Sequence, residues 1–257
     1  MHALHTLLLF HVLTYFGGNA LVSEIINGKK TKQSSMMYMA SVQDKGRRHV
    51  CGGFLISEDF VVTAAHCDDW KPTSVVLGTH NLKKVNDETM RFDVKRCKHP
   101  FYKEVASGND IMLLKLSRKA RRGKKTIKPL QLPGQDVKLK EGKKCKVAGW
   151  GFTRSHGEIV NDLQDVDVPI INLEKCQKAW RNKLPANVTC AGGYGTKKGF
   201  CQGDSGGPLV FKEKIAVGIV SFNSDSDCNY PTGVPNIYTD ISKFVPWIKE
   251  ILQKKTC

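Results

Sequence analysis

Residues 203–208 read Gly-Asp-Ser-Gly-Gly-Pro, and two other motifs precede this stretch in the chain. Residues 63–67 read Thr-Ala-Ala-His-Cys, and residues 109–114 read Asn-Asp-Ile-Met-Leu-Leu. A serine hydroxyl is a weak nucleophile at neutral pH, so it needs an imidazole to take its proton and a carboxylate to fix the tautomer of that imidazole. The three motifs therefore predict Ser205 as a nucleophile, His66 as its general base and Asp110 as the group that orients the base.

Each of these residues also has a simpler interpretation. Ser205 could lie by chance in a glycine-rich turn, and Asp110 could be an ordinary turn residue. However, Asp110 begins an apolar segment, so its carboxylate should be partly buried and should need a partner such as His66. His49 and His99 lack a comparable flanking motif, and the presence of all three motifs in one order favours catalysis.

With these motifs in the order His, Asp, Ser, the chain resembles the chymotrypsin-like serine proteases, the family whose triad is the best-known example of this chemistry. Within that family it is similar to the leukocyte granule proteases, the granzymes and mast-cell proteases. The resemblance implies an all-β fold of two six-stranded antiparallel β-barrels with a C-terminal α-helix, and hydrolysis of peptide bonds without a cofactor. It also implies an oxyanion hole formed by the backbone N–H groups of Gly203 and Ser205.

The N-terminal residues indicate a secreted protein. Residues 7–16 form a short, mostly apolar run, and residues 18–20 read Gly-Asn-Ala, a small-x-small pattern that suits signal peptidase. We therefore expect a signal peptide over residues 1–20, with an anchored or buried N-terminal helix as the alternative. No later segment reaches the length of a membrane span.

Residues 21–24 read Leu-Val-Ser-Glu and are expected to form an activation pro-peptide. Granule proteases have short pro-peptides that end in Glu and are removed by a dipeptidyl peptidase, so the resemblance implies a zymogen destined for a cytolytic granule and a role in immunity. It also implies that the new α-ammonium group of Ile25 pairs with Asp204. Glu24 argues against a digestive or plasma protease, because a trypsin-like activator does not cut after Glu.

Nine cysteines in a secreted chain indicate disulfide bonds. The resemblance implies three pairs, Cys51–Cys67, Cys176–Cys190 and Cys201–Cys228. It assigns no partner to Cys97, Cys145 or Cys257. Many relatives bridge the position of Cys145 to a cysteine where this chain has Phe211, so Cys145 is either a small buried thiol or has another partner.

Most of the chain reads as short strands rich in Val, Ile, Leu and Phe, separated by Gly, Pro and Asn, which suits β-barrels. The expected strands are residues 50–56, 60–63, 74–77, 111–116, 145–149, 166–171, 208–211, 215–221 and 236–239. The predicted protease domain, residues 25–257, is divided into a first barrel over about 25–117, a linker over 118–130, a second barrel over about 131–240 and a helix over 241–253. Apolar residues recur at helical spacing in that last segment, and we expect them to pack on the second barrel.

The pocket for the substrate side chain is expected to be uncharged. The resemblance places six residues in it: Gly199, Phe200, Ser221, Phe222, Asn223 and Asn236. Gly199 stands at the base, where trypsin-like members carry an Asp that binds Lys or Arg. Phe200 is expected to add apolar bulk, and Asn223 and Asn236 are expected to narrow the pocket. The sequence thus favours cleavage after a medium or small uncharged residue such as Leu, Met or Val, and the two lysines at 197–198 leave an acidic preference open.

The chain carries 40 Lys and Arg against 24 Asp and Glu, a formal net charge of +16. The densest cluster lies in residues 118–128, within the expected linker. So large a positive field favours an acidic polymer as a partner, and for a secreted protein we expect a sulfated proteoglycan rather than nucleic acid, for which no motif is present. The alternative function is a non-enzymatic cationic granule protein that binds glycans or microbial surfaces.

The sequence predicts neither a calcium nor a zinc site. Residues 78–84 correspond to the calcium loop of digestive relatives but lack its leading carboxylate, and no Cys/His spacing suggests zinc. Residues 187–189 read Asn-Val-Thr, which predicts N-glycosylation at Asn187. Besides protein or peptide substrates, the resemblance implies protein inhibitors such as serpins as partners.

Overall fold

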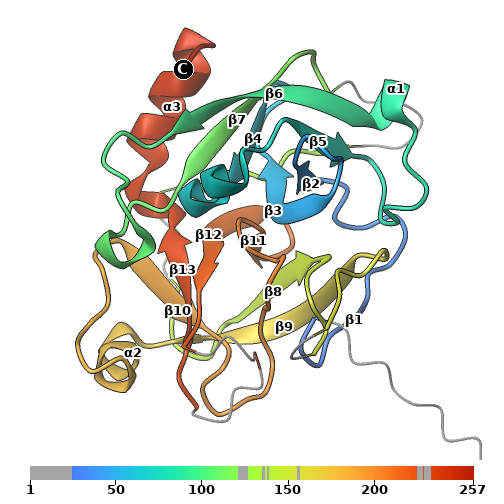
Figure 1. The fold of residues 1–257 in the computed structure, drawn as a ribbon. Helices are drawn as coiled ribbons and strands as arrows, with labels where there is room; N and C mark the ends of the chain where they lie inside the picture. Colours follow the sequence, from blue (N-terminus) through green and yellow to red (C-terminus); the bar gives the residue numbers. More distant parts are fainter. Residues whose placement is uncertain are drawn as a thin grey trace, which may run out of the picture.

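The computed structural model describes residues 25–120, 127–134, 137, 139–154, 157–224, 228 and 233–257. Its strands form two closed six-stranded antiparallel β-barrels that lie against each other, and a C-terminal helix follows the second barrel (Figure 1). The predicted fold class is therefore confirmed. The expected signal peptide, the expected pro-peptide and residues 121–126 of the basic linker lie outside the described residues. Within the described ranges, no helix has the length and apolar character needed to cross a membrane.

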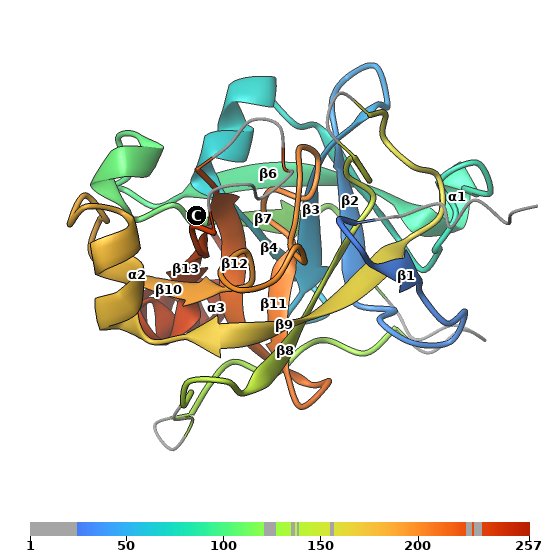
Figure 2. The same ribbon diagram turned by 90° about the horizontal axis from the view of Figure 1, so that it is seen from below.

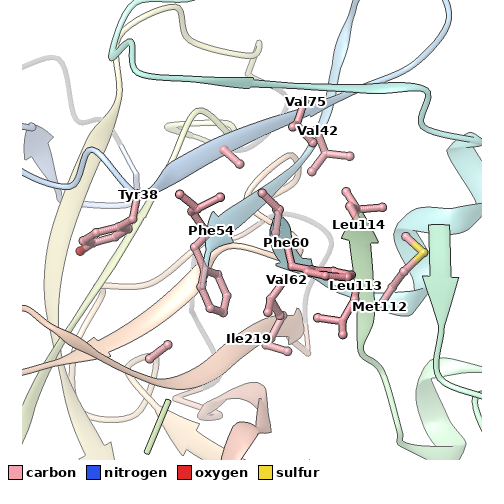
Figure 3. Close-up of a cluster of buried hydrophobic side chains, with 14 of the residues drawn as sticks. Tyr38, Val42, Phe54, Phe60, Val62, Val75, Met112, Leu113, Leu114 and Ile219 are labelled. Carbon is pink, nitrogen blue, oxygen red and sulfur yellow. The ribbon is translucent and has the colours of Figure 1, made fainter. Parts of the chain in front are cut away.

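The first barrel is built from strands β2 Met39–Gln43, β3 His49–Leu55, β4 Phe60–Thr63, β5 Ser74–Leu77, β6 Arg91–Lys98 and β7 Met112–Leu116. They pair in the order β2-β3-β4-β7-β6-β5, and β5 closes the barrel by pairing with β2. Phe54, Phe60 and Leu113 are fully buried and fill its centre (Figure 3). The centre of the barrel is thus apolar, and His49 lies at the start of one of its strands.

The second barrel is built from strands β8 Lys144–Gly149, β9 Gln164–Ile171, β10 Val188–Ala191, β11 Pro208–Phe211, β12 Ile215–Phe222 and β13 Asn236–Asp240. They pair in the order β9-β10-β13-β12-β11-β8, and β8 pairs with β9 to close the barrel. Ile219 of β12 belongs to the same buried apolar cluster as Val62 of the first barrel (Figure 3). The two barrels therefore share a continuous apolar contact.

The start of the described chain lies on the second barrel. Strand β1, Lys29–Lys30, pairs with β9, where Lys29 lies opposite Asp165. Ile25 is fully buried in the apolar cluster of the second barrel, together with Val147 and Leu209. The predicted division assigns these first residues to the first barrel. In the structure they lie on the second barrel, because Ile25 is buried in its core and β1 pairs with β9.

The strands without a clear sequence signal are β1, β2, β6 and β10. Strand β6 reads RFDVKRCK, and only Phe92 and Cys97 on it are buried, so charged side chains hide its apolar face. All residues of strand β2 are buried, so its sequence does not show the alternation of apolar and polar residues that marks a half-buried strand. Two of them are polar, and Gln43 Nε2 donates to Ser41 Oγ at 3.0 Å. Short helices connect the strands: η1 Ala65–Trp70, α1 Asp87–Met90, η2 Val105–Ser107 and α2 Leu173–Ala179.

The C-terminal segment consists of a 3₁₀ turn, η3 Ile241–Lys243, and the helix α3 Val245–Lys254, with Pro246 in its first turn. The prediction that this segment packs on the second barrel holds for η3, which contacts β12, but it was wrong for α3. Phe244 and Trp247 lie edge-on against His99, which follows β6, at ring-centroid distances of 5.3 and 4.8 Å. A disulfide from Cys97 to Cys257 holds the chain end on the same strand. Figure 1 shows α3 beside the first barrel.

The structure contains four disulfides, three of which are the pairs that the family resemblance implies: Cys51–Cys67, Cys176–Cys190 and Cys201–Cys228. The fourth, Cys97–Cys257, had no assignment from the sequence. Cys145 is a buried free thiol, and burial raises its pKa to about 12. Because the thiolate is the reactive form, Cys145 acts as a small core residue.

The position of α3 leads to a stability prediction. Ile248 is fully buried in the apolar cluster that α3 shares with both barrels. Ile248→Ala should lower the free energy of unfolding by about 2–5 kcal/mol, because it leaves a cavity at that contact. The matched control is Lys249→Ala, which changes an exposed residue on the same helix and should cost less than about 0.5 kcal/mol. Equal losses for the two variants in chemical denaturation would show that α3 is not docked there.

Candidate active site

His66 is held in a short, tightly anchored turn. It is the second residue of η1, which directly follows β4, and the neighbouring Cys67 is bonded to Cys51 of β3. Ala64 and Ala65 are fully buried, so the backbone on this side of the imidazole is packed. The side chain of His66 keeps an exposed fraction of 19%, which leaves one edge of the ring open to the surface.

Asp110 receives hydrogen bonds from both barrels. One carboxylate oxygen, Oδ2, accepts from His66 Nδ1 at 2.8 Å and from Ser221 Oγ of β12 at 2.5 Å. The other, Oδ1, accepts from the backbone N–H of His66 at 2.9 Å. Thr239 of β13 donates its hydroxyl to the backbone carbonyl of Asp110 at 2.9 Å. Because Nδ1 of His66 donates to the carboxylate, Nε2 is left as the basic nitrogen.

These contacts decide the ionisation of Asp110. Burial by itself would raise its pKa, but the hydrogen bonds from His66 and Ser221 and the charge on His66 outweigh burial. The net result is a pKa below the ordinary value for an aspartate. The buried carboxylate therefore remains charged at neutral pH and holds the imidazole in one orientation.

Ser205 lies in the turn that leads into β11, and this turn presses against the first barrel. Its backbone carbonyl accepts from the N–H of Gly52 at 2.8 Å. Gly206 has φ of +80°, and a Cβ placed on it would lie 2.1 Å from Thr63 Oγ1. Only glycine fits that position, because both the dihedral and the space exclude a side chain. The close approach brings the serine turn to the end of β4, three residues before His66.

His49 is a site residue for which the sequence gives no signal. Its ring nitrogens lie 2.8 Å from Ser41 Oγ and 2.9 Å from the carbonyl oxygen of Gly203. Burial lowers its pKa to about 4, so the ring is neutral at pH 7 and Nε2 donates to the carbonyl. With both nitrogens engaged, His49 cannot serve as the base, but it orients the peptide next to Ser205.

Asp204 is fully buried and has no charged partner among the described residues. Its carboxylate accepts from the backbone N–H groups of Gly151 at 2.8 Å and Cys201 at 2.9 Å. Burial outweighs these bonds and raises its pKa to about 7. Ile26 packs against Cys201, so the segment from Ile25 onward is buried against the same part of the second barrel.

The six residues expected in the substrate pocket differ in their contacts and in their exposure to solvent. Phe200 is buried against Tyr238 in the core of the second barrel, with ring centroids 5.3 Å apart, so it does not add the bulk that we expected in the pocket. Phe222 lies edge-on to Trp180 at 5.2 Å, on the side of α2. Ser221 directs its hydroxyl to Asp110. The other three differ in exposure: Gly199 and Asn236 are buried, and Asn223 is partly exposed.

The remaining predicted positions are placed as follows. Asn187 is exposed, so its side chain can be reached by a glycosylating enzyme. The only group of possible metal ligands in the described ranges is Cys51, His66 and Cys67, and its two sulfurs are joined in a disulfide. In the loop that corresponds to a calcium site, Asn81 Nδ2 donates to Asp162 at 2.8 Å, and Lys30 forms a salt bridge with the same carboxylate.

Comparison with known proteins agrees with this geometry. Residues 25–248 match the family model described as Trypsin. The chain is 41% identical over 235 residues to Granzyme B(G,H) of Mus musculus, covering 90% of this chain and 92% of that protein. It is 40% identical over 236 residues to Granzyme B of Homo sapiens, with the same coverage. It is 38% identical over 234 residues to mast cell protease 3 of Ovis aries, covering 90% of each.

Among solved structures, the chain resembles neuropsin, a serine protease expressed in the limbic system of mouse brain. The TM-score is 0.78 and the sequence identity is 35%. The match covers 89% of this chain and all of the neuropsin chain. The two-barrel arrangement around the site is therefore shared with a known structure.

The link between Asp110 and Ser221 leads to a prediction on stability and pH. Ser221→Ala removes one donor to a buried carboxylate, which should cost about 1–3 kcal/mol of unfolding free energy at pH 7. Because the folded-state pKa of Asp110 is depressed, this stabilisation exists above the unfolded pKa of about 3.9 and is lost as the pH falls through the folded value. The difference between variant and parent should therefore shrink below about pH 4.

The control for this prediction is Ser242→Ala, since Ser242 is exposed and donates its hydroxyl to the partly exposed residue Asp240 at 2.6 Å. Its effect should be small at every pH. Urea denaturation from pH 3 to 7 makes the comparison, and a Ser221→Ala loss that does not change with pH would contradict the role given to Asp110.

Proposed function

Because the chain belongs to the trypsin family of serine proteases, we propose that it is a secreted granule endopeptidase in which Ser205, His66 and Asp110 form the catalytic triad. The observation that carries the proposal is the chain of hydrogen bonds from His66 to Asp110 to Ser221, beside the turn that holds Ser205. This arrangement fixes the imidazole with its basic nitrogen free. A protein that only binds its partners, without catalysis, does not need this arrangement.

The proposed reaction follows from these positions. Ser205 Oγ attacks the substrate carbonyl carbon while His66 Nε2 takes the hydroxyl proton, and the π electrons of the carbonyl move to its oxygen. The backbone N–H groups of Gly203 and Ser205 are proposed to bind that oxyanion, and each such donor is typically worth about 10²–10³ in turnover. His66 then gives its proton to the leaving amine, the C–N bond breaks, and water repeats the sequence on the acyl-enzyme.

Activation is proposed to depend on Asp204. In the intact chain Ile25 follows Glu24, so its nitrogen is an amide and carries no charge. Removal of residues 1–24 would turn it into an ammonium group within a segment that is already buried beside Cys201. An opposite charge favours the ionised carboxylate, so pairing with this group would lower the pKa of Asp204 from about 7. The peptide that includes Gly203 and Ser205 would then be locked in place.

The proposed specificity is for medium or small uncharged side chains. Gly199 offers no charge for a basic residue, and Asn223 and Asn236 are proposed to narrow the pocket. With Phe200 in the core, its ring does not add the expected apolar bulk to the pocket. The specificity proposal therefore rests on Gly199 and the two asparagines.

The proposed setting is a cytolytic granule, reached through a signal peptide over residues 1–20. Glycosylation at Asn187, a dipeptidyl peptidase that removes residues 21–24, and serpins as inhibitors belong to the same proposal. The removal of residues 1–24 takes away one acidic residue, so the formal charge becomes 40 − 23 = +17. Such a charge supports storage on a sulfated proteoglycan. The alternative, a cationic granule protein without enzymatic activity, is distinguished by the following experiment.

The activated protein and its Ser205→Ala variant should be incubated with a peptide library. We expect the parent to cleave after Leu, Met, Val or similar residues and not after Lys or Arg, because Gly199 lacks a carboxylate. Ser205→Ala should lose hydrolysis almost completely and keep its binding to heparin, since the lysines and arginines carry the charge. Activity above a few per cent in Ser205→Ala would refute the triad.

Activation should also be visible as a change in pH-dependent stability. The pKa of Asp204 is about 7 in the intact chain against about 3.9 when unfolded, so the folded state binds more protons between these values. Its stability should therefore fall as the pH rises from about 4 to about 7, and Asp204→Asn should remove most of that fall. The exposed residue Asp93 provides the control Asp93→Asn, which should leave the profile unchanged.

The measurement is thermal denaturation of the Ser205→Ala chain, with and without residues 1–24. After cleavage before Ile25, the ion pair between its ammonium group and Asp204 should remove or reverse the fall in stability between pH 4 and 7. Full hydrolytic activity of a parent chain that still carries residues 21–24 would contradict the proposed activation.

A further inference from the structure

A large cavity lies on a part of the molecule that the proposed reaction does not use. It has a volume of about 720 Å³, which is in the range of small-ligand and peptide sites. Segments far apart in the sequence meet around it: the start of the chain near β1, the end of the linker, strands β8 and β9, and the turn between β11 and β12. Figure 2 shows that turn at the opposite end of the molecule from η1, which carries His66.

Lysines from all of these segments except β9 line the cavity, which we call the lysine cavity: Lys29, Lys32, Lys128, Lys146 and Lys214. Lys146 forms salt bridges with Asp165 and Asp167, both at 3.0 Å. The other four have no carboxylate partner among the described residues, and Glu213 is the only other acidic residue in the lining. Unpaired ammonium groups around one hollow concentrate positive potential, so the cavity is suited to a ligand with several negative charges.

Part of the cavity lining, which we call the wall, is apolar. It includes Met36, Met37, Tyr38 and Leu130, of which Tyr38 and Leu130 are buried and both methionines are partly exposed. Methionine side chains adapt to different apolar partners. A sulfated sugar chain has polar groups along its whole length and would leave this wall without a partner. A peptide with an apolar residue between acidic ones would satisfy both the wall and the lysines.

We propose that the lysine cavity is a binding site for an acidic peptide segment of another protein, with one apolar side chain inserted between the methionines and Tyr38. Its carboxylates pair with Lys29, Lys32, Lys128 and Lys214 at the rim. A protein that carries such a segment would be held on the enzyme at a distance from Ser205. This binding does not depend on hydrolysis, so it stands or falls separately from the proposed function.

The test uses the full chain with Ser205→Ala and a fluorescent ten-residue peptide that has a central Trp flanked by Glu. Fluorescence anisotropy measures its Kd near physiological salt. The combined variant Lys32→Gln, Lys128→Gln and Lys214→Gln should weaken binding about tenfold, as expected for three ion pairs formed by exposed lysines. The matched control is Lys71→Gln, Lys183→Gln and Lys249→Gln, three exposed lysines outside the cavity. It has the same net charge and should change Kd less than twofold.

Two further measurements distinguish the contribution of the apolar wall to binding from that of the lysines at the rim. Met37→Ser should weaken the Trp peptide severalfold and leave a peptide with Gly in place of Trp unaffected. A heparin hexasaccharide is the competing ligand. If its binding depends on the cavity lysines more strongly than that of the peptide, and Met37→Ser has no effect, the site is for a glycan and the proposal is overturned. Equal losses in the cavity and control variants would show general charge attraction and would also overturn it.

Discussion

The arrangement of the two barrels depends on one buried carboxylate, that of Asp110. It lies at the end of the first barrel but accepts a hydrogen bond from Ser221 of the second, and Thr239 bonds to its backbone. A buried charge without partners is costly, so both barrels must be correctly placed before this carboxylate is satisfied. The same set of bonds fixes the ring of His66. Docking of the barrels and orientation of the base are therefore one event.

Asp204 shows what the same residue type does without such partners. Both aspartates are almost fully buried, but Asp204 has only two backbone N–H donors, and its pKa rises to about 7 while that of Asp110 falls. Burial acts in the same direction on both residues, so the difference comes from the neighbouring charge and donors. In the proposed mechanism, activation supplies a charged partner to Asp204, whereas Asp110 is already stabilised by the donors of His66 and Ser221. Catalysis therefore depends on cleavage before Ile25.

The sequence predicted best what is local. The motifs around His66, Asp110 and Ser205 could be identified because each residue has a distinctive neighbourhood, and most strands carry an apolar signal. Ser221 and Asp110 are 111 residues apart, so their bond depends on the register of β12 and could not be derived from spacing. Strand β6 could not be predicted because most of its residues are charged. The surface on which α3 packs is set by tertiary contacts, such as that between Trp247 and His99, and not by its own sequence. The lysine cavity likewise joins segments that no sequence pattern connects.

Asp110 remains ionised because both barrels donate hydrogen bonds to it. Carbon-13 NMR of the Ser205→Ala chain, labelled at the aspartate carboxyl carbons, measures this directly as the pH is lowered. The Asp110 signal should titrate below the ordinary aspartate value of about 3.9, and Ser221→Ala should move its midpoint upward. A midpoint at or above that value in the parent chain, or one that Ser221→Ala leaves unchanged, would show that these hydrogen bonds do not keep Asp110 ionised.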